Sequence, residues 1–166
     1  MEISEFKSLL LLHYKMMYKV ALTILKDVNN AQDVTQEAVA SLWERREKLS
    51  TIENIQAFLV TVIKRQCIDY IRANKKCSVP IDDAIGTVSN DEFELRYDCK
   101  ESLQQVMSLM KTLPDNQQQV LRLRSFCCCS MEEISQITGF TVVNVRALIS
   151  RARRRLRELY LISEKQ

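Results

Sequence analysis

Hydrophobic and polar residues recur with the period of an α-helix along most of this 166-residue chain. Apolar residues spaced three or four positions apart predict amphipathic helices over 4–25, 30–46 and 55–73. No long run of alternating β-branched residues predicts a strand, and the chain contains only two glycines and two prolines. Because glycine and proline interrupt regular structure, such low usage favours helices joined by short loops. The sequence therefore predicts an all-α fold.

The most informative pattern lies in 130–157, where two short helical patterns flank a turn that contains glycine. Ser130 is suited to cap the first helix, and Glu133 three residues later completes a capping box. Gly139 stands where that helix would end in a left-handed conformation, and Thr141 can cap the helix that follows. These features together predict a helix-turn-helix.

The second helix of this motif has two contrasting sides. Its apolar side comprises Val145, Leu148, Ile149, Ala152 and Leu156, and its opposite side comprises Asn144, Arg146, Ala147, Ser150, Arg151 and Arg154. Six arginines and no acid occur between Asn144 and Arg157. A solvated surface helix usually mixes both signs of charge, so this pattern favours a face that enters the major groove of DNA.

The composition changes in the middle of the chain. Between 78 and 98 there are six acids and one base. We therefore expect two small helical domains, 1–76 and 100–166, joined by a flexible acidic linker over 77–99. In the second domain, Pro114 is expected in the first turn of a helix, where its missing N–H costs nothing.

Helical periodicity also assigns faces within the first domain. Asn30 is expected to cap the second helix. The core positions expected in that helix are Val34, Ala38, Val39, Leu42 and Trp43, and the exposed ones are Asp33, Gln36, Glu37, Ala40 and Glu44. A polar loop is expected over 48–54. The helix after it is expected to be mostly buried, at Ala57, Phe58, Val60, Thr61, Ile63, Cys67, Ile68 and Ile71. From the residues alone, the exposed acidic stripe is an ordinary solvated face.

Cysteine usage and the N-terminal segment bear on the cellular compartment. This segment lacks the basic start and cleavage site of a signal peptide, and no apolar run reaches the length of a membrane span. The six cysteines are therefore expected as free thiols in a reduced cytoplasm. No ligand spacing predicts a metal site, because the single histidine, His13, lies far from the cysteines. The consecutive Cys127, Cys128 and Cys129 suit structural packing better than a redox switch, although both interpretations stay open.

Three segments in this order resemble the extracytoplasmic-function (ECF) sigma factors, the minimal class of the sigma-70 family. They are NAQDVTQEAVASLWERREKL (30–49), AFLVTVIKRQCIDYIRANKK (57–76) and LPDNQQQVLRLRSFCCCSMEEISQITGFTVVNVRALISRARRRLREL (113–159). The first is similar to region 2.2 of that family, the second to regions 2.3 and 2.4, and the third to region 4.2. The resemblance implies a dissociable specificity subunit of bacterial RNA polymerase, with no catalytic activity, cofactor or small-molecule substrate.

The resemblance also implies binding surfaces and partners. The core polymerase would bind a helix face with Asp33, Gln36 and Glu37. The −10 promoter element would be melted and read by Ser50, Thr51, Glu53, Asn54, Lys64, Arg65, Gln66, Asp69 and Arg72. The −35 element would face Asn144, Arg146, Ala147, Ser150 and Arg151, with Arg154 better suited to a phosphate. An anti-sigma factor, soluble or membrane-anchored, would hold the free protein.

Three positions depart from the family pattern. Gln66 stands where the family usually has asparagine, Val39 replaces an aromatic residue, and Cys128 replaces a glycine that commonly ends a helix. A residue with a Cβ at that last position is either strained or part of a differently built turn.

The alternative function is a helix-turn-helix activator that binds duplex DNA without joining the polymerase. Such an activator needs a ligand-binding or receiver domain, and 1–75 lacks the strand–helix alternation of a receiver. No nucleotide-binding glycine loop, carboxylate pair near a histidine or metal-ligand spacing predicts an enzyme.

Overall fold

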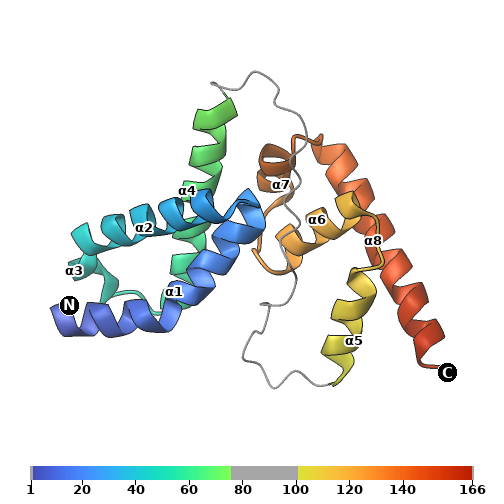
Figure 1. Cartoon of the computed structure of the whole chain (residues 1–166), viewed down its shortest axis with the longest axis horizontal. Helices are drawn as coiled ribbons and strands as arrows, with labels where there is room; N and C mark the ends of the chain where they lie inside the picture. The colour runs from blue at the N-terminus through green and yellow to red at the C-terminus, as the bar shows by residue number, and fades with distance from the viewer. Residues whose placement is uncertain (1, 76–100, 166) are drawn as a thin grey trace. The chain divides into compact units, whose positions relative to one another are not determined.

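The computed structural model describes residues 2–75 and 101–165. All regular structure within these ranges is α-helical, in eight helices labelled α1 to α8 (Figure 1). The chain divides into two compact units, whose described parts are α1–α4 and α5–α8. The all-α prediction is therefore confirmed. The linker predicted over 77–99 lies outside the described residues, so the domain boundaries stay a prediction.

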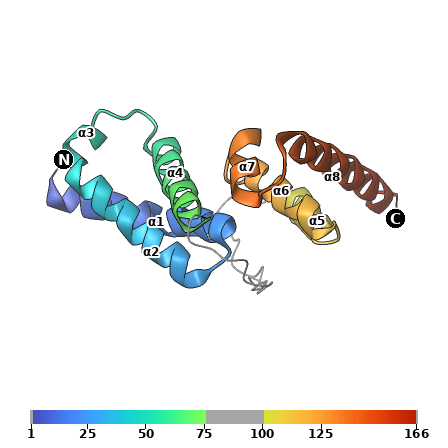
Figure 2. The same ribbon diagram turned by 90° about the horizontal axis from the view of Figure 1, so that it is seen from above.

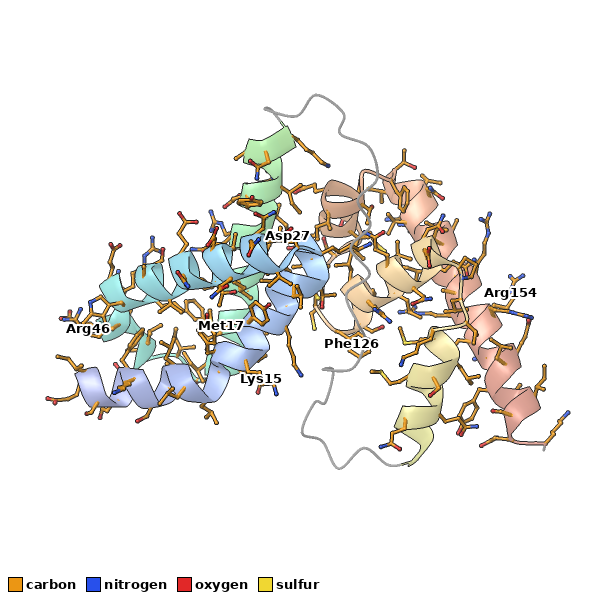
Figure 3. The ribbon with its side chains drawn as sticks, viewed as in Figure 1. Lys15, Met17, Asp27, Arg46, Phe126 and Arg154 are labelled. Atoms are coloured by element: carbon orange, nitrogen blue, oxygen red, sulfur yellow. The ribbon has the colours of Figure 1, made fainter. Side chains whose placement is uncertain are left out.

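The first unit is built from three long helices that pack against one another, α1 (Ile3–Leu25), α2 (Val28–Glu44) and α4 (Ile55–Lys75). Figures 1 and 2 show α1 and α2 running together, with α4 crossing them. Met17 of α1 points into the interior of this bundle (Figure 3), and both it and Ile63 of α4 are fully buried. Burying such a side chain contributes about 1.5–3 kcal/mol, so packing rather than helix propensity stabilises the unit.

The junction between α1 and α2 is formed by two consecutive residues. Lys26 adopts a left-handed backbone conformation with φ of 57°, where α1 ends. The carboxylate of Asp27, labelled in Figure 3, then accepts a hydrogen bond of 2.7 Å from the backbone N–H of Asn30 and caps α2. The prediction that Asn30 itself is the cap was therefore wrong. Aspartate and asparagine cap helices about equally well, so residue type could not choose between these nearby positions.

The other end of α2 is covered by an aromatic and cationic stack. Trp43, predicted to lie in the core, is 36% exposed. Its ring meets the ring of Phe6 edge-on with centroids 5.2 Å apart, and the guanidinium carbon of Arg46 lies 4.5 Å from its ring centroid. Arg46 begins α3 (Arg46–Leu49), a short helix whose last two residues fall within the polar loop predicted over 48–54. Because Leu49 is only 3% exposed, apolar burial explains why this segment is helical.

Periodicity located the buried faces of α2 and α4 only in part. The buried residues of α2 are Ala31, Val34, Thr35, Ala38 and Leu42, and Val39 is half-buried. The buried residues of α4 are Leu59, Ile63, Cys67 and Ile68, whereas Phe58, Val60 and Ile71 are half-buried. Ala57 and Thr61 are exposed, which contradicts the prediction that they are buried. Helix α4 is therefore amphipathic, with a face open to solvent.

Helix α1 is long and apolar enough to cross a membrane when only its length and composition are considered. The core helix of a soluble protein meets the same criterion, so the observation is weak. Helix α1 packs against α2 and α4 and buries Met17, Val20, Ala21 and Ile24. These contacts are those of a helix in a bundle.

The second unit is organised around its last helix. It comprises α5 (Glu101–Met110), α6 (Asp115–Ser125), α7 (Met131–Thr138) and α8 (Val142–Ser163). Helix α8 contacts each of the other three. A core cluster of buried residues includes Met110, Leu113, Leu121 and Ala152, with Phe126 and Leu156 packed against it.

A hydrogen bond joins the first and last helices of this unit. The amide nitrogen of Gln105 in α5 donates a 2.7 Å hydrogen bond to the hydroxyl of Ser163, at the end of α8.

Pro114 is the N-cap of α6 rather than a first-turn residue, one position before the one predicted. The missing N–H of proline is tolerated at either position, because no intrahelical partner exists for it there.

The turn between α6 and α7 contains the three consecutive cysteines. Cys127 and Cys129 are buried, whereas Cys128 is exposed and has a φ of 53°. The N–H of Cys129 donates to the Leu123 carbonyl at 3.0 Å, and the guanidinium of Arg124 donates to the Cys129 carbonyl at 2.8 Å. The turn thus keeps a left-handed backbone at a residue that carries a Cβ, which is the strained alternative anticipated from the sequence.

We expect Cys128→Gly to raise the free energy of unfolding of the second unit by about 0.5–1 kcal/mol. A left-handed conformation costs a residue with a Cβ about 1–2 kcal/mol, and the greater freedom of glycine in the unfolded chain offsets about 0.5–1 kcal/mol of that gain. Urea denaturation followed by circular dichroism measures the difference, with Trp43 emission recorded alongside to identify the transition of the first unit. Cys128→Ala is the matched control, because it removes the thiol and keeps the Cβ. An equal gain in that variant would assign the effect to the thiol and contradict the backbone explanation.

Candidate nucleic-acid interface

The helix-turn-helix predicted in 130–157 is present and is formed by α7 and α8. The Ser130 hydroxyl accepts a hydrogen bond from the Glu133 N–H at 3.1 Å, and the Glu133 carboxylate accepts one from the Ser130 N–H at 2.8 Å. Gly139 ends α7 with φ of 79°. An added Cβ at Gly139 would meet nothing within 4 Å, so its backbone conformation rather than lack of space requires glycine.

The start of α8 is fixed against α7. The Thr141 hydroxyl accepts a hydrogen bond of 3.2 Å from the Asn144 N–H, and the Ser135 hydroxyl of α7 donates one of 2.6 Å to the Phe140 carbonyl in the turn. The buried residues of α8 are Val145, Leu148, Ile149 and Ala152, four of the five predicted for the apolar side, and the fifth, Leu156, is half-buried. The orientation of α8 about its own axis is therefore set by apolar packing.

The opposite side of α8 is open to solvent. Its members, which we call the arginine face, are Asn144, Arg146, Ala147, Ser150, Arg151 and Arg154. All of these are exposed except Ala147, which is half-buried. Figure 3 shows Arg154 pointing outward from α8. The side chains predicted to contact the −35 element thus share one exposed surface.

One exposed residue on this side was missed by the sequence analysis. Val143 is 77% exposed in the first turn of α8. It precedes Ala147 by four residues and Ser150 by seven, so the three lie on one line along the helix. That spacing was visible in the sequence, but an apolar residue was not considered as part of a polar face.

A carboxylate modifies the electrostatics near the arginine face. The pKa of the Glu132 carboxyl is lowered, first by a hydrogen bond from its own backbone N–H and next by one from the Ser130 hydroxyl. Desolvation opposes this shift, whereas the charges of Arg146 and Arg124 add to it. Glu132 therefore stays ionised and offsets part of the positive charge at Arg146.

The first unit presents a second candidate surface on α4. Arg65, Asp69 and Arg72 are exposed and follow one another at i, i+4 and i+7, so they form one stripe along the helix. Arg72 and Asp69 form an ion pair at 3.3 Å. Lys64 is half-buried and lies beside this stripe.

The loop that leads into α4 is formed largely by residues with local hydrogen bonds. Ser50, Thr51, Glu53 and Asn54 are all exposed. The hydroxyls of Ser50 and Thr51 donate to the carbonyls of α3 residues Glu47 and Lys48, at 2.9 and 2.8 Å. The Asn54 side-chain oxygen accepts the Ala57 N–H at 3.0 Å and so caps α4. These bonds give the exposed loop a defined shape.

A third surface lies on α2. Asp33, Gln36 and Glu37 are all exposed, at the i, i+3 and i+4 positions that share one side of a helix. Their exposure is what periodicity predicted. The buried Val34 and Ala38 on the other side pack the helix into the bundle.

Comparisons with known families decide the identity. Residues 9–77 match the family model of sigma-70 region 2, and residues 103–156 match that of sigma-70 region 4. The chain belongs to the sigma-70 family. The two matches contain all three candidate surfaces.

Several relatives place the chain within the ECF class of sigma-70 proteins. The ECF RNA polymerase sigma factor SigM of Bacillus subtilis is 27% identical over 143 residues, which are 86% of this chain and 87% of SigM. RNA polymerase sigma factor SigV of the same organism is 28% identical over 148 residues, 87% of this chain and 84% of SigV. RNA polymerase sigma-E factor of Streptomyces coelicolor is 27% identical over 157 residues, 95% of this chain and 86% of that protein. The chain is thus an ECF-type RNA polymerase sigma factor, and the activator alternative is not favoured.

Two solved structures are also similar to this chain. The sigma factor RpoE in complex with the anti-sigma factor NepR, from Bartonella quintana, is 22% identical with a TM-score of 0.49, and the match covers 95% of this chain and 97% of RpoE. CnrH in complex with the cytosolic domain of CnrY is 20% identical with a TM-score of 0.42, covering 95% of this chain and 88% of CnrH.

One sigma-70 region 2 residue does not join the surface predicted for it. The amide nitrogen of Gln66 donates a hydrogen bond of 3.4 Å to the Ser41 hydroxyl on α2, and Gln66 is half-buried. Its side-chain oxygen is buried and has no hydrogen-bond partner among the residues that the structure describes. Gln66 therefore faces α2, whereas Arg65 and Asp69 face solvent.

Proposed function

We propose that this sigma factor uses its three exposed surfaces to bind three different targets. Helix α2 would bind core RNA polymerase, α4 with its preceding loop would bind the −10 element, and α8 would bind the −35 element. The observation that carries the proposal is the arginine face of α8, which is exposed by the apolar packing behind it. The match of residues 9–77 to sigma-70 region 2 supports the assignment of the other two surfaces.

At the −35 element, α8 would lie in the major groove of duplex DNA. A recognition helix contacts base edges with its N-terminal residues, and B-DNA admits a helix only on the major-groove side. Asn144, Arg146, Ala147, Ser150 and Arg151 would face the bases, and Arg154 would bind a phosphate. Arginine suits both tasks, because its guanidinium can bond guanine or phosphate with two N–H groups at once.

At the −10 element, the exposed stripe of α4 and the loop before it would bind unstacked bases. The pairing edge of a base becomes accessible only after it leaves the stack. The stripe residues Arg65, Asp69 and Arg72 would meet the DNA together with Ser50, Thr51, Glu53 and Asn54. Lys64 and Gln66 would flank the stripe, with Gln66 supporting α4 from the α2 side.

Core polymerase would bind the α2 face of Asp33, Gln36 and Glu37. Two carboxylates and an amide on an exposed helix side suit a partner surface rich in basic groups. The protein would carry out no chemistry of its own, would need no cofactor and would work in the cytoplasm. Its role would be to direct the polymerase to specific promoters.

We also propose that an anti-sigma factor holds the free protein. The sigma factor RpoE is solved in complex with the anti-sigma factor NepR, and CnrH is solved in complex with the cytosolic domain of CnrY. This partner can be soluble or anchored in a membrane. Affinity purification of the chain from native cells should recover such a protein, and failure to recover any would contradict the proposal.

A run-off transcription assay tests the function directly. Purified bacterial core polymerase would be incubated with and without the chain on a promoter library from the genome that encodes it. Transcripts that depend on the chain and share motifs near −35 and −10 would establish its promoter sequence. Tight binding of duplex DNA by the chain alone, without transcripts, would instead indicate the activator.

A further inference from the structure

An exposed apolar side chain lies at the N-terminal end of the arginine face. Val143 is 77% exposed, in the first turn of α8. With 3.6 residues per turn, Val143, Ala147 and Ser150 follow one line directly opposite the buried Val145 and Ile149. Arg146 and Arg151 flank this line on its two sides. The residue therefore lies on the midline of the surface that would enter the groove, at the N-terminal end of that surface.

Val143 takes no part in the capping of α8. The α8 N-cap bond is made by Thr141, and the residues placed for a hydrophobic staple across that cap are Phe140 and Val145. Val143 lies on the side away from the core of the unit. A β-branched residue is also a weaker helix former than alanine, so helix propensity does not favour it at this exposed position.

The neighbouring charges indicate what would cover Val143. The arginine face contains no acid, which suits polyanionic DNA and disfavours a basic or purely apolar partner. Within the major groove, the only apolar group on a base edge is the C5 methyl of thymine, and apolar side chains contact it. Small residues at Ala147 and Ser150 would allow α8 to approach the bases closely.

We propose that Val143 is a specificity-determining residue that contacts the C5 methyl of one thymine in the −35 element. The proposal rests on the proposed function and adds the base that this sigma factor prefers under the first turn of α8. One methyl group removed from water is worth a factor of about three to five in affinity.

The test removes the methyl group from the DNA instead of the protein. Each −35 thymine of a promoter found by run-off transcription would be replaced by uracil, which pairs identically and lacks only the methyl. Binding of the holoenzyme, assembled with the full-length chain, would be measured for each duplex. We expect one uracil substitution to weaken binding about three- to fivefold, and Val143→Ala to show no further loss at that position.

A matched variant tests whether the effect depends on the position of Val143 or arises at any exposed apolar residue of α8. Leu161→Ala also shortens an exposed apolar residue of α8, and it lies roughly 27 Å along the helix from Val143 at about 1.5 Å per residue. That variant should keep the full sensitivity to uracil. The same uracil penalty in Val143→Ala as in the wild type would assign the methyl to another residue and overturn the inference.

Two other outcomes also decide the matter. If no uracil substitution matters while the holoenzyme still distinguishes the promoter from a scrambled duplex, the inference fails and the proposed function stands. If the holoenzyme does not distinguish the two duplexes, the proposed function fails and the inference fails with it.

Discussion

Replacing Arg151 with alanine is expected to weaken holoenzyme binding at one −35 base pair by about 1–3 kcal/mol, a factor of about 5 to 150. Arg151 is exposed on the arginine face, two turns into α8, where a guanidinium can reach a base edge. A pair of hydrogen bonds to guanine discriminates against other bases, so the loss should be confined to promoters with the preferred base pair. Competition binding against a panel of −35 single-base variants measures this loss.

Arg155→Ala is the control for Arg151→Ala. Arg155 belongs to the same helix but lies outside the arginine face, and it forms an ion pair with Glu158 at 3.6 Å. An exposed pair of this kind contributes little, so its removal should leave the sequence preference unchanged. If Arg151→Ala instead weakened binding to all duplexes equally, with a shallower salt dependence, Arg151 would be a phosphate contact.

Reversing the charge of Glu37 is expected to weaken binding to core polymerase on the order of tenfold, or about 1.4 kcal/mol. Glu37 is exposed on the α2 face, so Glu37→Lys would place a lysine against the basic partner surface proposed above. The fold should persist, because the residue lies on the solvent side of α2. Titration of labelled core polymerase with the purified chain measures the affinity.

Glu47→Lys is the matched charge reversal for this test. Glu47 is exposed on α3, in the same unit but outside the α2 face. Equal loss in both variants would indicate a general effect of charge and contradict the assignment of the α2 face. Binding of −35 duplex DNA should be unchanged in both variants, because α8 belongs to the other unit.

The helix-turn-helix could be predicted almost residue by residue because its signals are local. Ser130, Glu133 and Thr141 form their capping hydrogen bonds with residues three positions away. Gly139 adopts the left-handed backbone conformation that ends α7. The packing side of α8 also followed from periodicity, since that helix rests on its unit along one side only. Such features depend on chain neighbours and need no knowledge of distant contacts.

Features that depend on tertiary contacts were predicted less well. Trp43 was assigned to the core because helical periodicity places it on the apolar side of α2, but Phe6 from α1 and Arg46 cover only part of its ring. Ala57 and Thr61 were assigned to the core because α4 carries apolar residues on most sides, whereas two neighbouring helices can cover only one side. Gln66 was assigned to the −10 surface by resemblance alone, and its hydrogen bond to Ser41 depends on the packing of α4 against α2.

The stacking of Trp43 has a spectroscopic consequence. It is the only tryptophan in the chain, and it lies between the Phe6 ring of α1 and the Arg46 guanidinium of α3. Its emission therefore reports the integrity of the first unit alone, while far-ultraviolet circular dichroism averages over helices of both. Denaturation curves from the two signals need not coincide, and their separation would give each unit its own stability without any label or truncation.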